Sequence, residues 1–80
     1  MDAKAISAHI EELVAEEHRL IDLEAERPLS AAERERLTTV NVALDQYYDL
    51  LRQRRAREEF DQDPESAQLR SADTVEKYLQ

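Results

Sequence analysis

Two histidines and two carboxylates in the first third of the chain are the residues that could bind a metal. They are His9, Glu12, Glu17 and His18. Zinc sites and di-iron bundles need ligands that converge on one point, as a Glu-x-x-His pair on facing helices does. The chain contains no Glu-x-x-His, and its two histidines are nine residues apart, which points them to different sides of a helix. We therefore predict no metal and no cofactor; metal-dependent activity at these four residues is the second alternative.

A second chemical feature is the basic cluster Arg52-Gln53-Arg54-Arg55-Ala56-Arg57. Four arginines so close together could bind phosphate, which suggests a nucleic-acid or ribosome-associated regulator as the first alternative function. Against this, Glu58 and Glu59 follow directly, and the chain carries a net charge of −8, which repels nucleic acid. Cations near the end of a helix also interact favourably with its dipole. Nucleic acid is therefore not our predicted partner.

Two charged residues interrupt the apolar pattern of the predicted helices. Glu17 lies between Leu13 and Leu20 in the first helix, and Arg55 continues the apolar stripe of the second. A buried carboxylate is costly unless it is paired and hydrogen-bonded. No cation lies opposite Glu17 within one hairpin, so we hypothesise that Glu17 of one chain meets Arg55 of another in an antiparallel dimer. The alternative is a Glu17 side chain that leans to the edge of the stripe and finds another partner.

The middle of the second helix supplies further candidates for an interaction surface. We expect one ring of Tyr47 and Tyr48 to lie in the core and the other at an interface, where tyrosine is enriched. Leu50 lies off the main stripe and widens the apolar surface. No serine has a recognisable His/Asp arrangement, so a catalytic nucleophile is not predicted. The candidate interaction residues are Glu17, His18, Tyr47, Tyr48, Leu50, Arg52, Arg54, Arg55 and Arg57.

Composition places these residues on long solvated helices. Of the 80 residues, 38% are charged, and there is neither cysteine nor glycine. Without glycine, a Walker loop, a Rossmann fingerprint and a nucleophile elbow are all absent. Without cysteine, a reducing compartment fits. No apolar run approaches the roughly 18–20 residues that span a bilayer, and the N-terminus does not resemble a signal peptide. We expect a cytoplasmic protein without a membrane partner.

Apolar periodicity predicts an all-α fold, an antiparallel hairpin of two coiled-coil-like helices over residues 1–60. The first helix should run over 2–26 with Asp2 as its N-cap, and Pro28 should end it. The turn covers 27–30. The sequence Ser30-Ala31-Ala32-Glu33 predicts a capping box that starts the second helix, over 31–60. A turn this short makes the helices antiparallel neighbours.

Residues 61–80 form an acidic tail that we expect to be irregular apart from a short helical turn near 74–79. A single hairpin buries little apolar surface for its length. We therefore expect it to dimerise into a four-helix bundle, to dock its own tail, or to do both. The predicted partner is a second copy of the chain, and an unidentified protein partner is also possible.

Several segments of the chain resemble the DUF2630 family, short bacterial proteins of unknown function. The matching residues are 13–20, 44–57 (Leu-Asp-Gln-Tyr-Tyr-Asp-Leu-Leu-Arg-Gln-Arg-Arg-Ala-Arg), 63–65 and 75–80. The family often has tryptophan where this chain has Tyr48, and glycine somewhere within 59–62. The resemblance implies that the tail belongs to the domain, and it supplies no activity, substrate or cofactor. We predict a small non-catalytic helical module for protein–protein interaction or structure.

Overall fold

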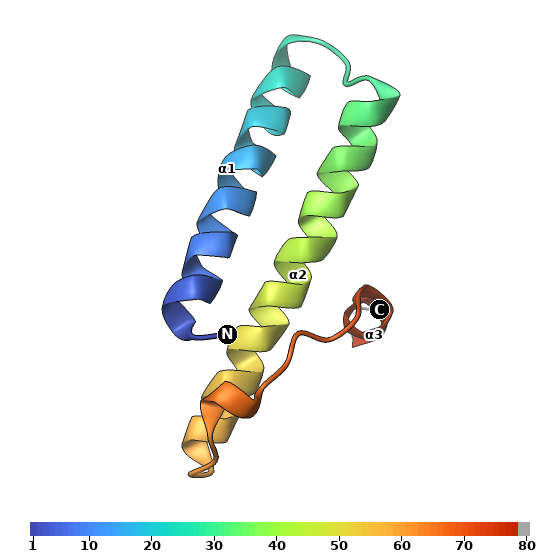
Figure 1. Cartoon of the computed structure of the whole chain (residues 1–80). Helices are drawn as coiled ribbons and strands as arrows, with labels where there is room; N and C mark the ends of the chain where they lie inside the picture. Colours follow the sequence, from blue (N-terminus) through green and yellow to red (C-terminus); the bar gives the residue numbers. More distant parts are fainter. Residues whose placement is uncertain (79–80) are drawn as a thin grey trace.

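The computed structural model describes residues 1–78, and this part of the chain is helical without strands. Two long helices, α1 (Ala3–Glu26) and α2 (Ala31–Glu59), lie antiparallel and form the hairpin in Figure 1. A 3₁₀ turn, η1 (Pro64–Ser66), and a short helix, α3 (Ala72–Tyr78), follow along the flank of α2. No helix in this part of the chain is long and apolar enough to cross a membrane. The predicted all-α hairpin is confirmed.

The turn between the long helices is fixed by the residues that the sequence suggested. Ser30 Oγ accepts a hydrogen bond from the Glu33 N–H (3.1 Å), and Glu33 Oε1 accepts one from the Ser30 N–H (2.8 Å). Arg27 adds two bonds to the same carboxylate, at 2.8 and 2.9 Å. Hydrogen bonds from Arg27 and from the Ser30 backbone lower the pKa of Glu33 to about 2. One carboxylate therefore caps α2 and also closes the turn.

The start of α1 and the seam between the helices follow the apolar pattern. Asp2 caps α1 by accepting a hydrogen bond from the Ala5 N–H at 2.8 Å. Farther along, Arg36 of α2 donates to Glu16 of α1 through Nε and through Nη2, the latter at 2.7 Å. This contact with Arg36 lowers the pKa of Glu16. Between the helices, the buried apolar side chains are Ile6, Leu20, Val40 and Leu44.

The C-terminal end of α2 depends on a left-handed residue. Asp61 has φ = 55°, and the Gln62 N–H donates to the Arg57 carbonyl at 2.7 Å. The Asp61 N–H donates to the Glu58 carbonyl at 3.3 Å, which completes a Schellman motif. A left-handed φ favours glycine, and among other residues it is best tolerated by Asn and Asp.

The tail is more ordered than the sequence suggested, because η1, the segment after it and α3 all pack on α2. Ala67 is buried with Leu50 and Ile6 in one cluster, and Val75 of α3 is also buried. Gln46 and Gln53 donate to the Arg70 and Gln68 carbonyls, at 3.1 and 2.9 Å. The expected helical turn at 74–79 begins two residues earlier, and residue 79 lies outside the described residues. The tail therefore docks on its own hairpin.

The contact of α3 with α2 includes one unfavourable charge. Oxygen Oε1 of Glu76 is buried, and no described residue donates a hydrogen bond to it. Burial, and then the neighbouring Asp45 carboxyl, raise the pKa of Glu76. Because the pKa of Glu76 is higher in the folded protein than its ordinary value of 4.5, the protonated carboxyl stabilises the fold at a pH below 4.5. This contribution is lost as the pH rises through the pKa that Glu76 has in the folded protein. At neutral pH, this carboxylate therefore weakens the docking of α3.

We expect Arg27→Gln to raise the pKa of Glu33 from about 2 toward 4.5, because the carboxylate loses its strongest hydrogen bonds. The folded-state pKa is lowered, so the stability that the pair contributes is present above pH 4.5 and is lost as the pH falls toward 2. Carboxyl ¹³C shifts measured in a pH titration check the value. Arg52→Gln removes the same charge at an exposed site and serves as control. If the titration midpoint of Glu33 is the same in Arg27→Gln as in the parent, Arg27 does not cause the lowered pKa.

Replacing Asp61 by glycine should stabilise the protein, because glycine adopts φ = 55° without a steric cost. After allowing for the extra freedom of glycine in the unfolded chain, we expect a gain of about 0.5 kcal/mol in the free energy of unfolding. Asp61→Ala is the matched control and should be destabilising. Urea unfolding followed by circular dichroism measures both variants, and a glycine variant less stable than the alanine variant contradicts the left-handed cap.

Candidate functional site

Arg54, and not Arg55, is the cation in the seam of the hairpin. Arg54 is buried, with 8% of its surface exposed, while Arg55 is exposed. The expectation that Arg55 continues the apolar stripe is therefore wrong. The alternating four-and-three spacing of Val40, Leu44, Tyr47 and Leu51 reaches residue 54 at its next step, and this signal was present in the sequence.

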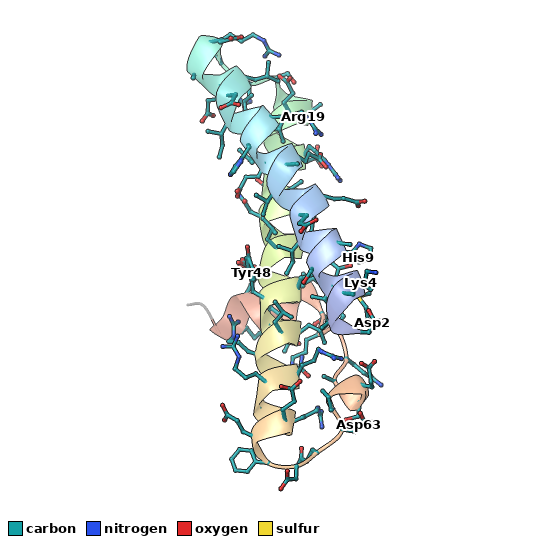
Figure 2. All side chains as sticks on the ribbon, turned by 90° about the vertical axis from the view of Figure 1, so that its left-hand side faces the viewer. Asp2, Lys4, His9, Arg19, Tyr48 and Asp63 are labelled. Atoms are coloured by element: carbon teal, nitrogen blue, oxygen red, sulfur yellow. The ribbon has the colours of Figure 1, made fainter. Side chains whose placement is uncertain are left out.

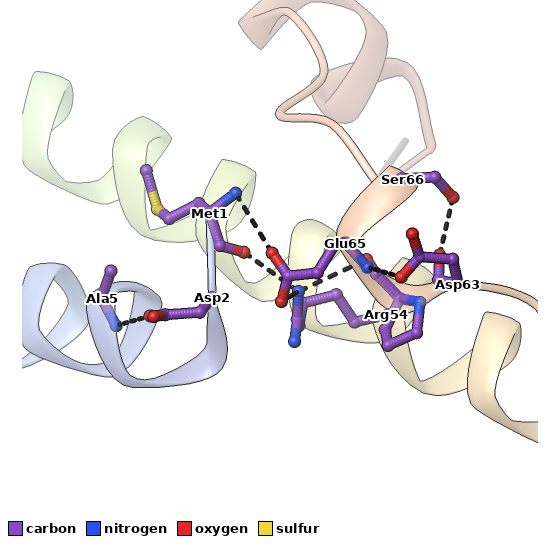
Figure 3. A network of polar contacts seen from close by, with 8 residues as sticks. Met1, Asp2, Ala5, Arg54, Asp63, Glu65 and Ser66 are labelled. Atoms are coloured by element: carbon purple, nitrogen blue, oxygen red, sulfur yellow. Dashed lines mark hydrogen bonds and ion pairs between the residues drawn. The ribbon is translucent and has the colours of Figure 1, made fainter.

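The Arg54 guanidinium joins three segments at the base of the hairpin, as Figure 3 shows. Its Nη1 donates to the Met1 carbonyl (3.0 Å), to the Pro64 carbonyl (3.3 Å) and to Glu65 Oε1 (3.0 Å). Glu65 also lies 3.8 Å from the amino group of Met1. Asp63 caps η1 by accepting a hydrogen bond from the Glu65 N–H at 2.9 Å. The start of α1, the end of α2 and η1 are therefore held by one side chain.

This cluster is suited to holding the chain together. A guanidinium has donors and no acceptor, and here two backbone carbonyls and one carboxylate accept hydrogen bonds from its Nη1. The cluster contains no histidine, no cysteine and no activated hydroxyl, since Ser66 Oγ donates to the Asp63 carbonyl at 2.6 Å. The arrangement supports a structural clamp.

The other arginines of the basic cluster lie outside this clamp and in different environments. Arg52 and Arg55 are exposed on the hairpin, whereas Arg57 is half-buried beside the tail. The four arginines therefore do not gather into the single cationic surface that the sequence suggested. Leu50, also a candidate for an intermolecular surface, lies in the core with Ala67 of the tail, so that expectation is corrected.

The two neighbouring tyrosines divide as expected between core and surface. Tyr47 packs against the core cluster, and its ring stacks on His9 with centroids 5.1 Å apart. Tyr48 is 41% exposed. Figure 2 shows Tyr48 on the opposite side of the hairpin from His9 and Arg19. The adjacent rings therefore serve different surfaces.

A mixed apolar and charged surface runs along the side of the hairpin that carries Tyr48. Ile21 follows Arg19 by two positions, which is about 200° around α1, so it lies on the side away from Arg19, where Tyr48 is. Ile21 is 47% exposed, and Glu17, one turn earlier, is half-buried. On α2, Arg52 and Arg55 follow Tyr48 at helical spacing and are exposed. We call this surface the Tyr48 face: Val14, Glu17, Ile21, Tyr48, Arg52 and Arg55.

The residues considered for a metal site remain apart. His9 stacks on Tyr47, while Glu12 and His18 are exposed and Glu17 belongs to the Tyr48 face. Within residues 1–78, no group of three or more His, Cys, Asp or Glu side chains converges as metal ligands would. The second alternative function has no geometry to build on in this part of the chain.

Sequence reasoning missed Asp49, a carboxylate of which only 6% is exposed. Asp49 accepts a hydrogen bond from Gln53 at 2.9 Å, and its other oxygen lies 3.6 Å from Arg70 of the tail. The spacing of Asp49 and Gln53, four residues on one helix, was visible in the sequence. Its contact with Arg70 depends on how the tail folds back and was not visible.

Comparisons with known proteins match nearly the whole chain, including the tail. A family model described as a protein of unknown function, DUF2630, matches residues 2–80. An uncharacterised protein of Mycobacterium tuberculosis is 44% identical over 72 residues, which cover 89% of this chain and 83% of that protein. An uncharacterised protein of Mycobacterium bovis matches with the same identity and coverage. No solved structure matches the chain.

We expect Arg54→Met to lower the free energy of unfolding by about 2–3 kcal/mol, because it leaves carbonyls of Met1 and Pro64 without their donor. Arg19→Met makes the same change at an exposed site outside the clamp and should stay within about 0.5 kcal/mol of the parent. Urea denaturation at fixed protein concentration measures both. Equal effects at the two positions would contradict the clamp.

Proposed function

Because the chain belongs to the DUF2630 family of proteins of unknown function, we propose its role from its own geometry: a non-catalytic helical interaction module. The module self-associates through the Tyr48 face. The observation that carries this proposal is the presence there of two large exposed apolar side chains, Ile21 and Tyr48, beside charges of both signs. The absence of cysteine supports a cytoplasmic location.

The apolar part of the Tyr48 face is suited to a protein partner. Ile21 and Tyr48 are 47% and 41% exposed, and the half-buried Val14 lies on the same side of α1. Aromatic residues are enriched at interfaces, where the ring supplies apolar contact area and the hydroxyl tolerates water. The tail packs on Leu50, Gln46 and Gln53, on other faces of α2, and leaves Tyr48 open.

The charges of the Tyr48 face favour a second copy as the partner. The stack of His9 on Tyr47 sets the register of the two helices. In this register, Glu17 lies about 13 Å from the level of Tyr48 toward the turn, and Arg55 about 10 Å toward the base. A two-fold axis near Tyr48 therefore brings Glu17 of each chain opposite Arg55 of the other. A two-fold contact is self-complementary, so one such pair implies two.

Such a dimer would be an antiparallel four-helix bundle with Tyr48 and its symmetry mate near the centre. The pairing of Glu17 with Arg55 does not require Arg55 to lie in the seam of its own hairpin, since the contact is between chains. A nucleic acid could use only Arg52 and Arg55 of this face as cationic contacts, and the chain as a whole has a net charge of −8. Self-association uses both signs of charge.

Size-exclusion chromatography with light scattering should give twice the mass of the 9.3 kDa chain. Ile21→Glu combined with Tyr48→Glu should shift the species to the monomer, because charged side chains would replace the apolar contact. Leu69→Glu is the matched control, since Leu69 is 45% exposed on the tail. A monomeric parent, or an equal effect of the control, would overturn the proposal.

The charge pairing has its own test. Glu17→Arg and Arg55→Glu should each weaken the dimer by placing like charges opposite one another, and the double variant should recover most of the loss. Dissociation constants from analytical ultracentrifugation at low salt measure the coupling. If the two losses of dimer affinity simply add in the double variant, Glu17 and Arg55 are not in contact across the interface. Self-association itself would not be contradicted by that result.

A further inference from the structure

A small hollow lies where the end of α2 meets the returning tail. Its volume is about 220 Å³, and it is lined by Gln53, Ala56, Arg57, Phe60, Gln62 and Arg70. Six residues on two separate segments of the chain form it, so it exists only when the tail is docked. The hollow lies outside the Tyr48 face and outside the Arg54 clamp, so ligand binding there does not depend on the proposed self-association.

The chemistry of this lining is opposite to that of the chain as a whole. Acidic residues outnumber basic ones 19 to 11 along the sequence, yet the hollow is lined by two arginines and two glutamines without a carboxylate. Asp49, which is not among the lining residues, lies 3.6 Å from Arg70 and offsets its charge. Arg57 supplies a positive charge at the hollow and Gln62 supplies a side-chain amide, whereas both N–H groups of the Gln53 amide already bond to Asp49 and the Gln68 carbonyl. This combination favours an anion.

A second observation that points to an anion is an unsatisfied hydrogen-bond donor on Arg57. Its Nε atom is buried, and no described residue accepts a hydrogen bond from it. Buried polar groups in folded proteins are nearly always hydrogen-bonded, so an unsatisfied charged donor calls for an explanation, and a bound ion is one. The guanidinium presents its donors as a planar fork that matches two oxygens of a carboxylate or a phosphate.

The walls of the hollow are held in place from outside it. Asp49 accepts a hydrogen bond from Gln53 and contacts Arg70 at 3.6 Å. Gln53 also donates to the Gln68 carbonyl, and the Arg70 carbonyl accepts from Gln46. At the other end, the Schellman motif fixes Gln62 to the Arg57 carbonyl. These contacts hold the Gln53 and Arg70 side chains and the backbone of Gln62 in place before a ligand binds, which is the property of a preorganised site.

Size and shape narrow the class of ligand. Pockets for drug-sized molecules are usually about 300–1,000 Å³, so this hollow is too small for one. It suits one oxyanion group with a little of what carries it. Phe60 lines the same hollow and is 75% exposed, so its ring can cover an apolar or aromatic part of the ligand that extends outward.

We propose that the hollow between the end of α2 and the tail binds a small oxyanion, a phosphate or carboxylate group carried by an apolar or aromatic body. Arg57 holds two oxygens of the group with its fork. Arg70 adds positive charge while keeping its contact with Asp49, and Gln62 supplies a side-chain amide. Phe60 contacts the body. A ligand bound here would stabilise the docked tail, because the site needs both segments.

The test is an NMR titration of the full chain with three probes of similar shape: phenyl phosphate, benzoate and benzylamine. Phenyl phosphate or benzoate should shift the Arg57 Nε–H signal saturably, and benzylamine should not. A response to only one of the two anions identifies the oxyanion. No saturable shift with either anion, or the same shift with benzylamine, would overturn the proposal.

Variants separate recognition by the fork from attraction by charge. Arg57→Lys keeps the charge and loses the fork, so the affinity should fall about tenfold, the value of one charge-assisted hydrogen bond. Arg55→Lys, on the Tyr48 face, should leave it unchanged. If Arg57→Lys does not fold, Phe60→Ala tests the site instead. Loss of this exposed ring should weaken the binding of phenyl phosphate and leave the binding of inorganic phosphate unchanged. Equal binding in these variants and the parent would overturn the site.

Discussion

A guanidinium that is taken out of water must find acceptors, and in this protein the acceptors come from three separate parts of the chain. Arg54 reaches the Met1 carbonyl, the Pro64 carbonyl and Glu65. Breaking a buried charged contact costs more than a typical hydrogen bond contributes, because the remaining group is left without its solvent and without its partner. The start of α1, the end of α2 and η1 therefore have to be in place together, and this requirement holds the first part of the tail at the base of the hairpin.

The tail also completes the apolar core that a two-helix hairpin lacks. Leu50 is buried in one cluster with Ile6 of α1 and Ala67 of the tail, so the tail covers part of its surface. Val75 of α3 is almost completely buried, although α3 itself is short. The match of the family model to residue 80 fits a tail that belongs to the fold. The α3 contact includes the Glu76 carboxyl near Asp45, a charge that weakens docking at neutral pH.

Once the tail is docked, the surface of α2 is divided among different tasks. One side packs on α1, a second carries the tail and the hollow beside Arg57, and a third exposes Tyr48, Arg52 and Arg55. Four arginines that are adjacent in sequence are thereby separated into a buried clamp, a half-buried pocket wall and an open face. This separation is the physical reason why a compact basic segment does not become one basic surface.

Local chemistry was sufficient to predict the hairpin. Asp2, Pro28, Ser30 and Glu33 act within a few residues of their own position, so the start of each helix and the turn could be located without tertiary information. The sequence predicted that one ring of Tyr47 and Tyr48 would be core and the other exposed, and the structure decided which. Strict heptad spacing would have predicted the burial of Arg54, but Arg55, the next residue, was predicted in its place. Only the tertiary structure decided that Leu50 is core, that Asp49 meets Arg70 and that Arg57 lines a hollow. Each of these depends on a tail that returns from residues 61–78, and sequence periodicity says nothing about where a short segment docks after a turn.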